Sequence, residues 1–268
     1  MINKNIIVNA DDLGITPGTN KAIFDGYDNG YITSSSIMTN CDFFNEAIND
    51  LKKREHLKVG VHLNLTYGKP LNNSLLFCDS NGSFNLSYLQ LVKKSFFNKK
   101  FLEGIKKEFE SQIQKALKND IDISHLDSHR HIHLIPNIYK IVYDLAIKYE
   151  IVRVRLITED LLNSLKLTKN FNFFINGGLV KYLLLKLFTI FNKRYGDRYG
   201  DIYFYSILYT GALARSSLLK ILRSDNNYEI MVHPSYVDLD KEVIFHSEAE
   251  KAYRLSENRT IELSSILK

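Results

Sequence analysis

Residues Ile123–Pro136 read ISHLDSHRHIHLIP and contain the pattern that decides the fold. Residues 123–128 alternate as in a strand, and Pro136 suits the first position of a helix because its φ is already fixed near the helical value. Four histidines and one aspartate occupy alternate positions from 125 to 133. The segment therefore predicts a strand, a polar loop and a helix in succession. It also places metal-binding or acid–base side chains where the strand ends.

Three other short apolar runs end in the same kinds of residue. They read NIIVNADD (Asn5–Asp12), KVGVHLNL (Lys58–Leu65) and YEIMVHP (Tyr228–Pro234). Parallel strands joined by helices align their C-terminal ends, and barrel-like α/β enzymes build their sites at those ends. Because chance rarely puts Asp or His at the same place in four strands, the repetition predicts an α/β enzyme.

Strand and helix patterns alternate along the chain, and neither a repeat nor a linker interrupts them. We expect strands at Lys4–Ala10, Ile32–Thr39, Leu57–Leu65, Ile121–Ser128, Ile151–Ile157 and Tyr228–Val232. We expect helices at Pro17–Asn29 (capped by Thr16), Phe43–Arg54, Leu86–Leu117 (broken near Asn98), Pro136–Tyr149 and Ser247–Asn258, the last on the surface. The alternation indicates one domain over residues 1–268, built as a TIM-like (β/α)-barrel that need not have all eight regular strands. The alternative is an open doubly wound sheet, but no glycine-rich phosphate loop follows the first strand.

Composition and charge exclude several classes of function. The 268 residues carry 35 basic and 30 acidic side chains, a net charge of +5 that is spread along the chain, so we expect no nucleic-acid partner. Cys41 and Cys78 lie in no CxxC pair and near no histidine at ligand spacing, which fits a reducing, cytoplasmic location. The apolar stretch Ile6–Val8 is too short for a signal peptide.

The apolar stretch Phe171–Phe191 is interrupted by lysines, asparagines and two glycines, which makes it a poor membrane span. We interpret it as a buried helix or as the contact of a homodimer. The alternative is a surface that rests on a membrane or accepts a lipid-linked substrate.

Each candidate site residue also has a plainer interpretation when taken alone. One of Asp11 and Asp12 could cap a helix, although Thr16 already serves that purpose. His62 could be a hydrogen-bonded core residue and His233 a turn residue. Together, the strand ends supply one Asp and two His for a metal that keeps positions open for water and substrate. A carboxylate base and an imidazole acid are left over.

With these four segments in this order, the chain resembles the YdjC-like carbohydrate deacetylases, the family of the chitooligosaccharide deacetylase. The matching segments are IVNADDLG, GVHLNLTYGKPL, HLDSHRHIHLIP and EIMVHPSY, with FYSILYTGAL (Phe204–Leu213) as a looser match. The resemblance implies a distorted (β/α)-barrel that removes acetyl groups from N-acetylated amino sugars, in oligosaccharides or linked to glycans or lipids, with a divalent metal.

The resemblance also implies a role for each matching residue. The second aspartate of NADD, the histidine of GVHL and the histidine after DS would bind the metal, and these are Asp12, His62 and His129. Asp11 would be the general base and His233 of VHP the general acid.

Three further positions would lie beside the metal or against the substrate, and they are Asp127, His131 and an arginine. Arg153 and Arg155 both lie on the strand where the family carries that arginine; the motif does not decide between them, and Arg155 is the candidate.

The resemblance favours Mg²⁺, while Zn²⁺ and Mn²⁺ also suit a site of mixed nitrogen and oxygen ligands. Two alternative functions are consistent with the same residues. A metal-dependent hydrolase of another amide or ester would use them all. A non-catalytic sugar- or lipid-binding module would need neither base nor acid.

Overall fold

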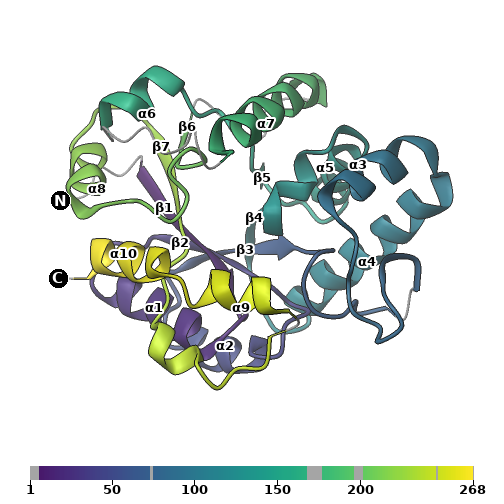
Figure 1. The fold of residues 1–268 in the computed structure, drawn as a ribbon, viewed down its shortest axis with the longest axis horizontal. Coiled ribbons are helices and arrows are strands. Elements are labelled where there is room, and N and C mark those ends of the chain that lie inside the picture. Colours follow the sequence, from purple (N-terminus) through teal and green to yellow (C-terminus); the bar gives the residue numbers. More distant parts are fainter. Residues whose placement is uncertain (1–5, 73–74, 168–176, 196–201, 246, 268) are drawn as a thin grey trace.

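A computed structural model describes residues 6–72, 75–167, 177–195, 202–245 and 247–267, in which seven parallel strands form one curled sheet (Figure 1). The strands are β1 (Ile6–Leu13), β2 (Ser34–Ile37), β3 (Lys58–Leu63), β4 (Ile123–Ser128), β5 (Arg153–Val154), β6 (Tyr203–Tyr205) and β7 (Tyr228–Val232). They are ordered β5-β4-β3-β2-β1-β7-β6. The sheet is thus a half-barrel with β5 and β6 at its edges, which confirms the predicted distorted α/β barrel.

Helices surround the sheet and connect its strands (Figure 1). They are α1 (Pro17–Asp28), α2 (Phe44–Leu51), α3 (Tyr88–Phe97), α4 (Lys99–Leu117), α5 (Pro136–Lys148), α6 (Leu161–Leu167), α7 (Gly178–Asn192), α8 (Arg215–Leu222), α9 (Glu248–Arg254) and α10 (Glu257–Ile266). A 3₁₀ segment, η2 (His129–Leu134), joins β4 to α5. Among the described residues, no helix has the length and apolar character needed to cross a bilayer.

Local chemistry explains where several helices begin. The side chain of Thr16 accepts a hydrogen bond from the Thr19 amide, and Pro17 occupies the first turn of α1. Asn98 ends α3 and caps α4 by accepting from the Phe101 amide, so the break predicted near this residue is confirmed. The structure bears out the helix start at Pro136 as well.

The two faces of the sheet differ in chemistry. In β1, Val8 and Ala10 are fully buried in the apolar core between the sheet and its helices. Asn9 points the other way, and its amide donates to the side-chain oxygens of Ser36 and Asp11, each at 2.8 Å. The inner face of the half-barrel is therefore polar and the outer face apolar, which is the arrangement that a site inside the barrel requires.

Strand β1 runs three residues further than the predicted end at Ala10. Its pairing with β2 shifts register between Ala10 and Leu13, and Asp12 adopts a φ of 73°. A bulge re-aims a side chain, and Asp tolerates the left-handed conformation better than most residues. As a result, both carboxylates of the Asp11–Asp12 pair reach the inner site instead of pointing to opposite faces.

Three other expectations need correction. The strand predicted at Ile151–Ile157 shortens to the two residues of β5, and no strand was predicted at β6. Residues Ser247–Asn258 do not form one surface helix. They contain α9 and the start of α10, and these two helices pack over the ends of the strands. Both helices therefore bury charged side chains, which are Glu250, Arg254, Arg259 and Glu262.

Candidate metal centre and active site

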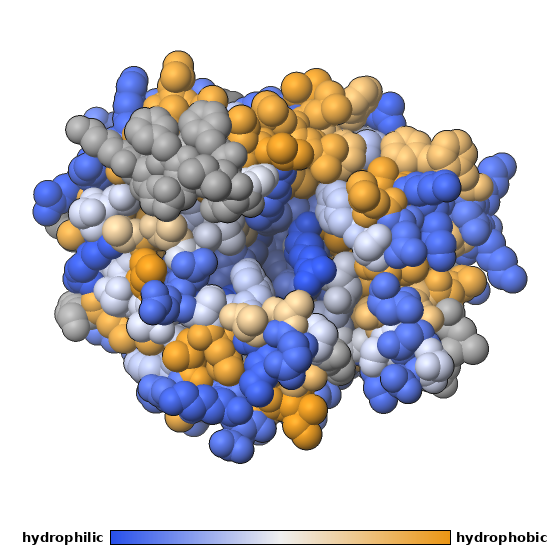
Figure 2. All heavy atoms as spheres, viewed as in Figure 1, coloured by the Kyte–Doolittle hydropathy of each residue, from blue (hydrophilic) through white to orange (hydrophobic). Residues whose placement is uncertain are grey.

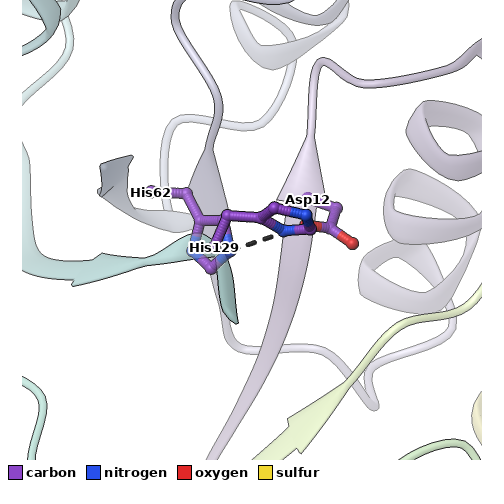
Figure 3. A group of neighbouring side chains, drawn as sticks. All are labelled: Asp12, His62 and His129. Atoms are coloured by element: carbon purple, nitrogen blue, oxygen red, sulfur yellow. Dashed lines mark hydrogen bonds and ion pairs between the residues drawn. The ribbon is translucent and has the colours of Figure 1, made fainter. Parts of the chain in front are cut away.

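Asp12, His62 and His129 converge at the C-terminal ends of β1, β3 and β4 (Figure 3). One ligand atom from each lies within 4.8 Å of the other two. Asp12 Oδ1 is 3.5 Å from His62 Nε2 and 3.1 Å from His129 Nδ1. Ligands about 2.0–2.2 Å from a common ion are separated by about 3.0–3.5 Å. The three side chains therefore have the spacing of a metal site before any rearrangement.

His62 is oriented by the carboxylate behind it. Its Nδ1 lies 2.8 Å from Asp127 Oδ1, so Nε2 is directed at Asp12. A carboxylate in this position fixes the ring and its tautomer in many metal sites. Burial lowers the pKa of His62, but the charges of Asp127 and Asp11 outweigh burial and raise it.

His129 is a neutral imidazole at physiological pH. Burial lowers its pKa to about 4, against the opposing effect of Asp12. Its Nε2 is buried and has no hydrogen-bond partner among the described residues. A neutral ring can give a lone pair to a metal, and one carboxylate with two imidazoles at this spacing is a donor set that fits a divalent cation.

Asp11, His62 and Asp127 also approach closely enough to hold an ion. Both carboxylates of this second group are already bound by Arg155, whose NH1 lies 2.7 Å from an oxygen of each. A cation placed there would meet the guanidinium charge. The group of Asp12, His62 and His129 is the better candidate, because in the described part of the chain Asp12 Oδ1 lies next to two imidazoles and Arg254 binds the other oxygen.

Arg155 is the centre of the polar interior. It is fully buried, binds both oxygens of Asp11 at 2.7 and 2.9 Å, and donates from Nε to Glu229 at 2.7 Å. Arg153, two residues earlier, donates to the same Glu229 carboxylate at 2.9 Å. Arg155, which directly follows β5, is the arginine that binds Asp11 and Asp127.

Asp11 and His233 come from neighbouring strands. Ala10 pairs with Val232 in the register of β1 and β7, and Asp11 and His233 are the residues that directly follow this pair. His233 Nε2 is 3.9 Å from Asp11 Oδ2, and its Nδ1 is 3.6 Å from Glu262 Oε2. The Glu262 carboxylate also accepts from the His233 amide at 2.6 Å, so it holds this histidine in place.

The second oxygen of Asp12 is bound by the C-terminal helices. Arg254 NH1 lies 2.5 Å from Oδ2 and its Nε donates to Glu250 at 2.6 Å, while Arg259 NH1 is 3.6 Å from the same oxygen. Burial raises the pKa of Asp12, but Arg254 and His129 outweigh burial and hold it well below its usual value. Asp12 is therefore a carboxylate with one oxygen fixed and the other free for a ligand role.

A cavity of about 490 Å³ opens beside these residues. Asp11, His62, His129 and His233 line one side of it, and α7 lines the other. His131 also lines the cavity, and burial keeps its pKa well below the usual value. The cavity has the size of a small-ligand pocket and brings a ligand against both a metal group and two acid–base side chains.

Sequence patterns did not indicate four residues of the site, namely Glu229, Arg254, Arg259 and Glu262. Glu229 precedes the apolar end of its strand, and the other three belong to polar stretches of helix. The spacing of Glu250 and Arg254 indicates an ion pair along a helix. It does not indicate that the pair is buried against Asp12.

Comparison with known proteins identifies the family. A carbohydrate deacetylase from Halalkalibacterium halodurans is 32% identical over 234 residues, which cover 87% of this chain and 86% of that protein. One from Thermoanaerobacter pseudethanolicus is 31% identical over 242 residues (88% and 82%), and one from Clostridium beijerinckii is 34% identical over 169 residues (62% and 66%).

A crystal structure from Enterococcus faecalis, titled a putative cellobiose-phosphate cleavage protein, has the same fold. It superposes with a TM-score of 0.63 at 20% identity and covers 97% of this chain and 94% of its own. The model of the family described as YdjC-like protein matches residues 5–268. The chain belongs to the YdjC-like family.

Proposed function

We propose that this protein is a metal-dependent carbohydrate deacetylase, which hydrolyses the acetamide of N-acetylated amino sugars. The observation that carries the proposal is the meeting of Asp12, His62 and His129 with Asp11 and His233 at one cavity. Relatives that align over most of this chain are named carbohydrate deacetylases. Amide hydrolysis needs an activated water, a base and an acid, and this group of side chains can supply all three.

A divalent cation on Asp12, His62 and His129 would acidify a water and stabilise the charge that develops on the acetamide oxygen. Asp11 accepts the proton of the attacking water, and Arg155 binds both of its oxygens and so fixes this carboxylate at the wall of the cavity. His233 donates a proton to the departing amine. The products are acetate and the free amino sugar.

His131 and Asp127 act around this centre. His131 lines the cavity and contacts the substrate, whereas Asp127 holds the ring of His62. We favour Mg²⁺ as the cation. Two imidazoles also suit Zn²⁺ and Mn²⁺, so the rate with each ion decides the choice. We further propose that residues 1–268 act as one domain in the cytoplasm, where two free cysteines would stay reduced.

The test is acetate release from short N-acetylglucosamine oligomers, with Mg²⁺, Mn²⁺ or Zn²⁺ added after chelation. Asp11→Asn should lower turnover about 10²–10⁴-fold, because it removes the base, and keep the metal content, because Asp11 is not among the three proposed ligands. His129→Ala should lose both metal and turnover. Asp144→Asn, an exposed carboxylate on α5, serves as the matched control.

Two outcomes would contradict the proposal. Near-full turnover of Asp11→Asn would remove Asp11 as the base. Absence of acetate with every ion, from protein whose metal content is shown by elemental analysis, would keep the metal site and point to hydrolysis of another amide or ester.

A further inference from the structure

Helix α7 exposes a continuous apolar stripe. Its side chains are between 49% and 72% exposed, and they are Val180, Leu183, Leu187, Ile190 and Phe191. Positions spaced by three and four residues lie on one side of a helix, so the stripe covers roughly 100° of its circumference. Figure 2 shows this apolar surface over α7, beside the central hollow of the molecule.

The opposite side of α7 is already buried. Tyr182, Leu185 and Phe188 face the core, where the helix packs against α5 and η2. A helix that is apolar on both sides is normally enclosed on both. The prediction of a buried helix here is therefore only half right, and no described residue encloses the outer side. Residues 171–176 of the predicted stretch lie outside the described part of the chain.

The exposed charges at the C-terminal end of the stripe are basic, whereas Asp160 lies near Lys186. Lys186 and Lys193 border it, Arg194 follows at its C-terminal end, and Lys193 and Arg194 are exposed. From residue 161 to residue 195 the sequence contains six basic residues and no Asp or Glu. An apolar stripe with a basic border matches the interior and the headgroups of an anionic bilayer.

A second copy of this chain fits the same surface less well. In a two-fold dimer the patch would face itself, since such an interface uses the same surface on both subunits. Each subunit would then bring the same exposed basic residues, Lys193 and Arg194, to the interface, and residues 161–195 supply no Asp or Glu to pair with them. This charge argument favours a bilayer over a dimer.

The stripe is also continuous with the cavity. Val180 belongs to both, and Leu184 on the same helix lines the cavity from the half-buried side. We propose that the outer face of α7 docks on an anionic lipid surface and that the cavity takes acetamido sugars linked to lipid at that surface. The docking stands on the surface of α7 alone, whereas the substrate class rests on the proposed deacetylase function.

Binding to lipid vesicles tests the docking without any catalysis. Wild-type protein is sedimented with vesicles of phosphatidylcholine alone and of phosphatidylcholine mixed with phosphatidylglycerol. We expect at least about tenfold stronger binding to the mixed vesicles, weakening as salt is added. Leu187→Ser/Ile190→Ser should reduce that binding at least about tenfold, because both side chains leave the stripe.

The matched control replaces apolar residues that are as exposed but lie elsewhere. Val152→Ser/Ile244→Ser should bind vesicles as the wild type does, since these residues are 74% and 93% exposed and belong to no part of α7. Lys193→Glu/Arg194→Glu should weaken binding with the stripe intact. Acetate release from a soluble oligomer should be unchanged in all three variants, which shows that they are folded.

A lipid-linked acetamido sugar in the mixed vesicles completes the test. We expect Leu187→Ser/Ile190→Ser to release acetate from it at least about tenfold more slowly than the wild type. Equal vesicle binding by wild type and this variant would overturn the docking. So would a dimer that the same variant converts to monomer while the wild type ignores vesicles. Vesicle binding with no acetate from either substrate would instead overturn the proposed function and leave the docking in place.

Discussion

His62 and Asp127 are direct neighbours in the register of β3 and β4, and their side chains meet at 2.8 Å on the inner face of the sheet. Parallel pairing places both side chains on the same face, so backbone register sets the distance between them. Asp127 also binds Arg155 and Ser36, each at 2.7 Å. The ring of His62, a candidate metal ligand, is therefore held by Asp127, which Arg155 and Ser36 hold in turn.

Asp127→Asn should weaken binding of a divalent cation about 10–100-fold, because an amide orients His62 less firmly and makes it a weaker ligand. Calorimetric titration with Mg²⁺ and Zn²⁺ measures the change. Asp79→Asn, in the loop before α3, is the control and should keep wild-type affinity. Unchanged affinity in Asp127→Asn would remove Asp127 from the metal site.

Arg254→Met should lower the free energy of unfolding by about 3–5 kcal/mol, since it leaves Asp12 and Glu250 buried without their main counter-charge. Urea denaturation in the presence of chelator measures this loss. Lys251→Met changes an exposed residue on the same helix and should stay within about 0.5 kcal/mol of wild type. A loss below 1 kcal/mol for Arg254→Met would mean that the ion pair is not a stabilising contact.

Gly60→Ala should destabilise the protein by about 1–3 kcal/mol through overpacking. A Cβ at this position would lie 2.4 to 2.5 Å from the ring of His125. Hydrogen-bond contacts to Ser36 at 3.1 Å and Ser124 at 2.9 Å limit the movement of that ring.

The double variant Gly60→Ala/His125→Ser isolates this contact. Removing the ring should relieve the clash, so a double-mutant cycle should give a coupling energy of at least about 1 kcal/mol. Additive effects of the two changes would show that the destabilisation has another source.

Stability of the metal-free protein should fall steeply as the pH drops from about 6.5 toward 4. Burial lowers the pKa of His125 to about 3 and those of His129 and His133 to about 4. These rings are neutral in the folded state and take up protons on unfolding, and each contributes up to about 1.4 kcal/mol per pH unit in that window. Asp12 and Asp127, whose pKa values are lowered, lose their contribution only below that window.

Urea denaturation at a series of pH values, with chelator present, measures the slope. His125→Gln should reduce the slope by about one proton, because one buried neutral ring is removed. A free energy of unfolding that stays constant between pH 6.5 and 4.5 would be incompatible with neutral buried histidines.

Much of the site could be predicted because its residues lie at the ends of strands. Asp11, His62 and His233 each follow a short apolar run. In a parallel barrel all such strands point the same way, so the residues at their C-terminal ends come together. The two aspartates were harder to place. A regular strand would have pointed Asp11 and Asp12 to opposite faces, and only the bulge at Asp12, with its φ of 73°, brings both inside.

The C-terminal helices could not be interpreted from their sequence. A helix that buries charges against an aspartate of β1 has the same composition as a solvated helix, and its partner is more than two hundred residues away. The length of β5 could not be predicted from sequence patterns either. Ile151–Ile157 is apolar enough for a full strand, yet only Arg153 and Val154 pair with β4 at the edge of the sheet.

The contact between Asp12 and Arg254 spans 242 positions of the chain. Contacts of such separation form late, because the entropy of closing a long loop must be overcome first. During synthesis, the first strand leaves the ribosome long before the helix that neutralises its aspartate. Asp12, His62 and His129 all precede residue 130, so we expect a nascent chain to hold all three candidate ligands while Asp12 still lacks its counter-charge from α9.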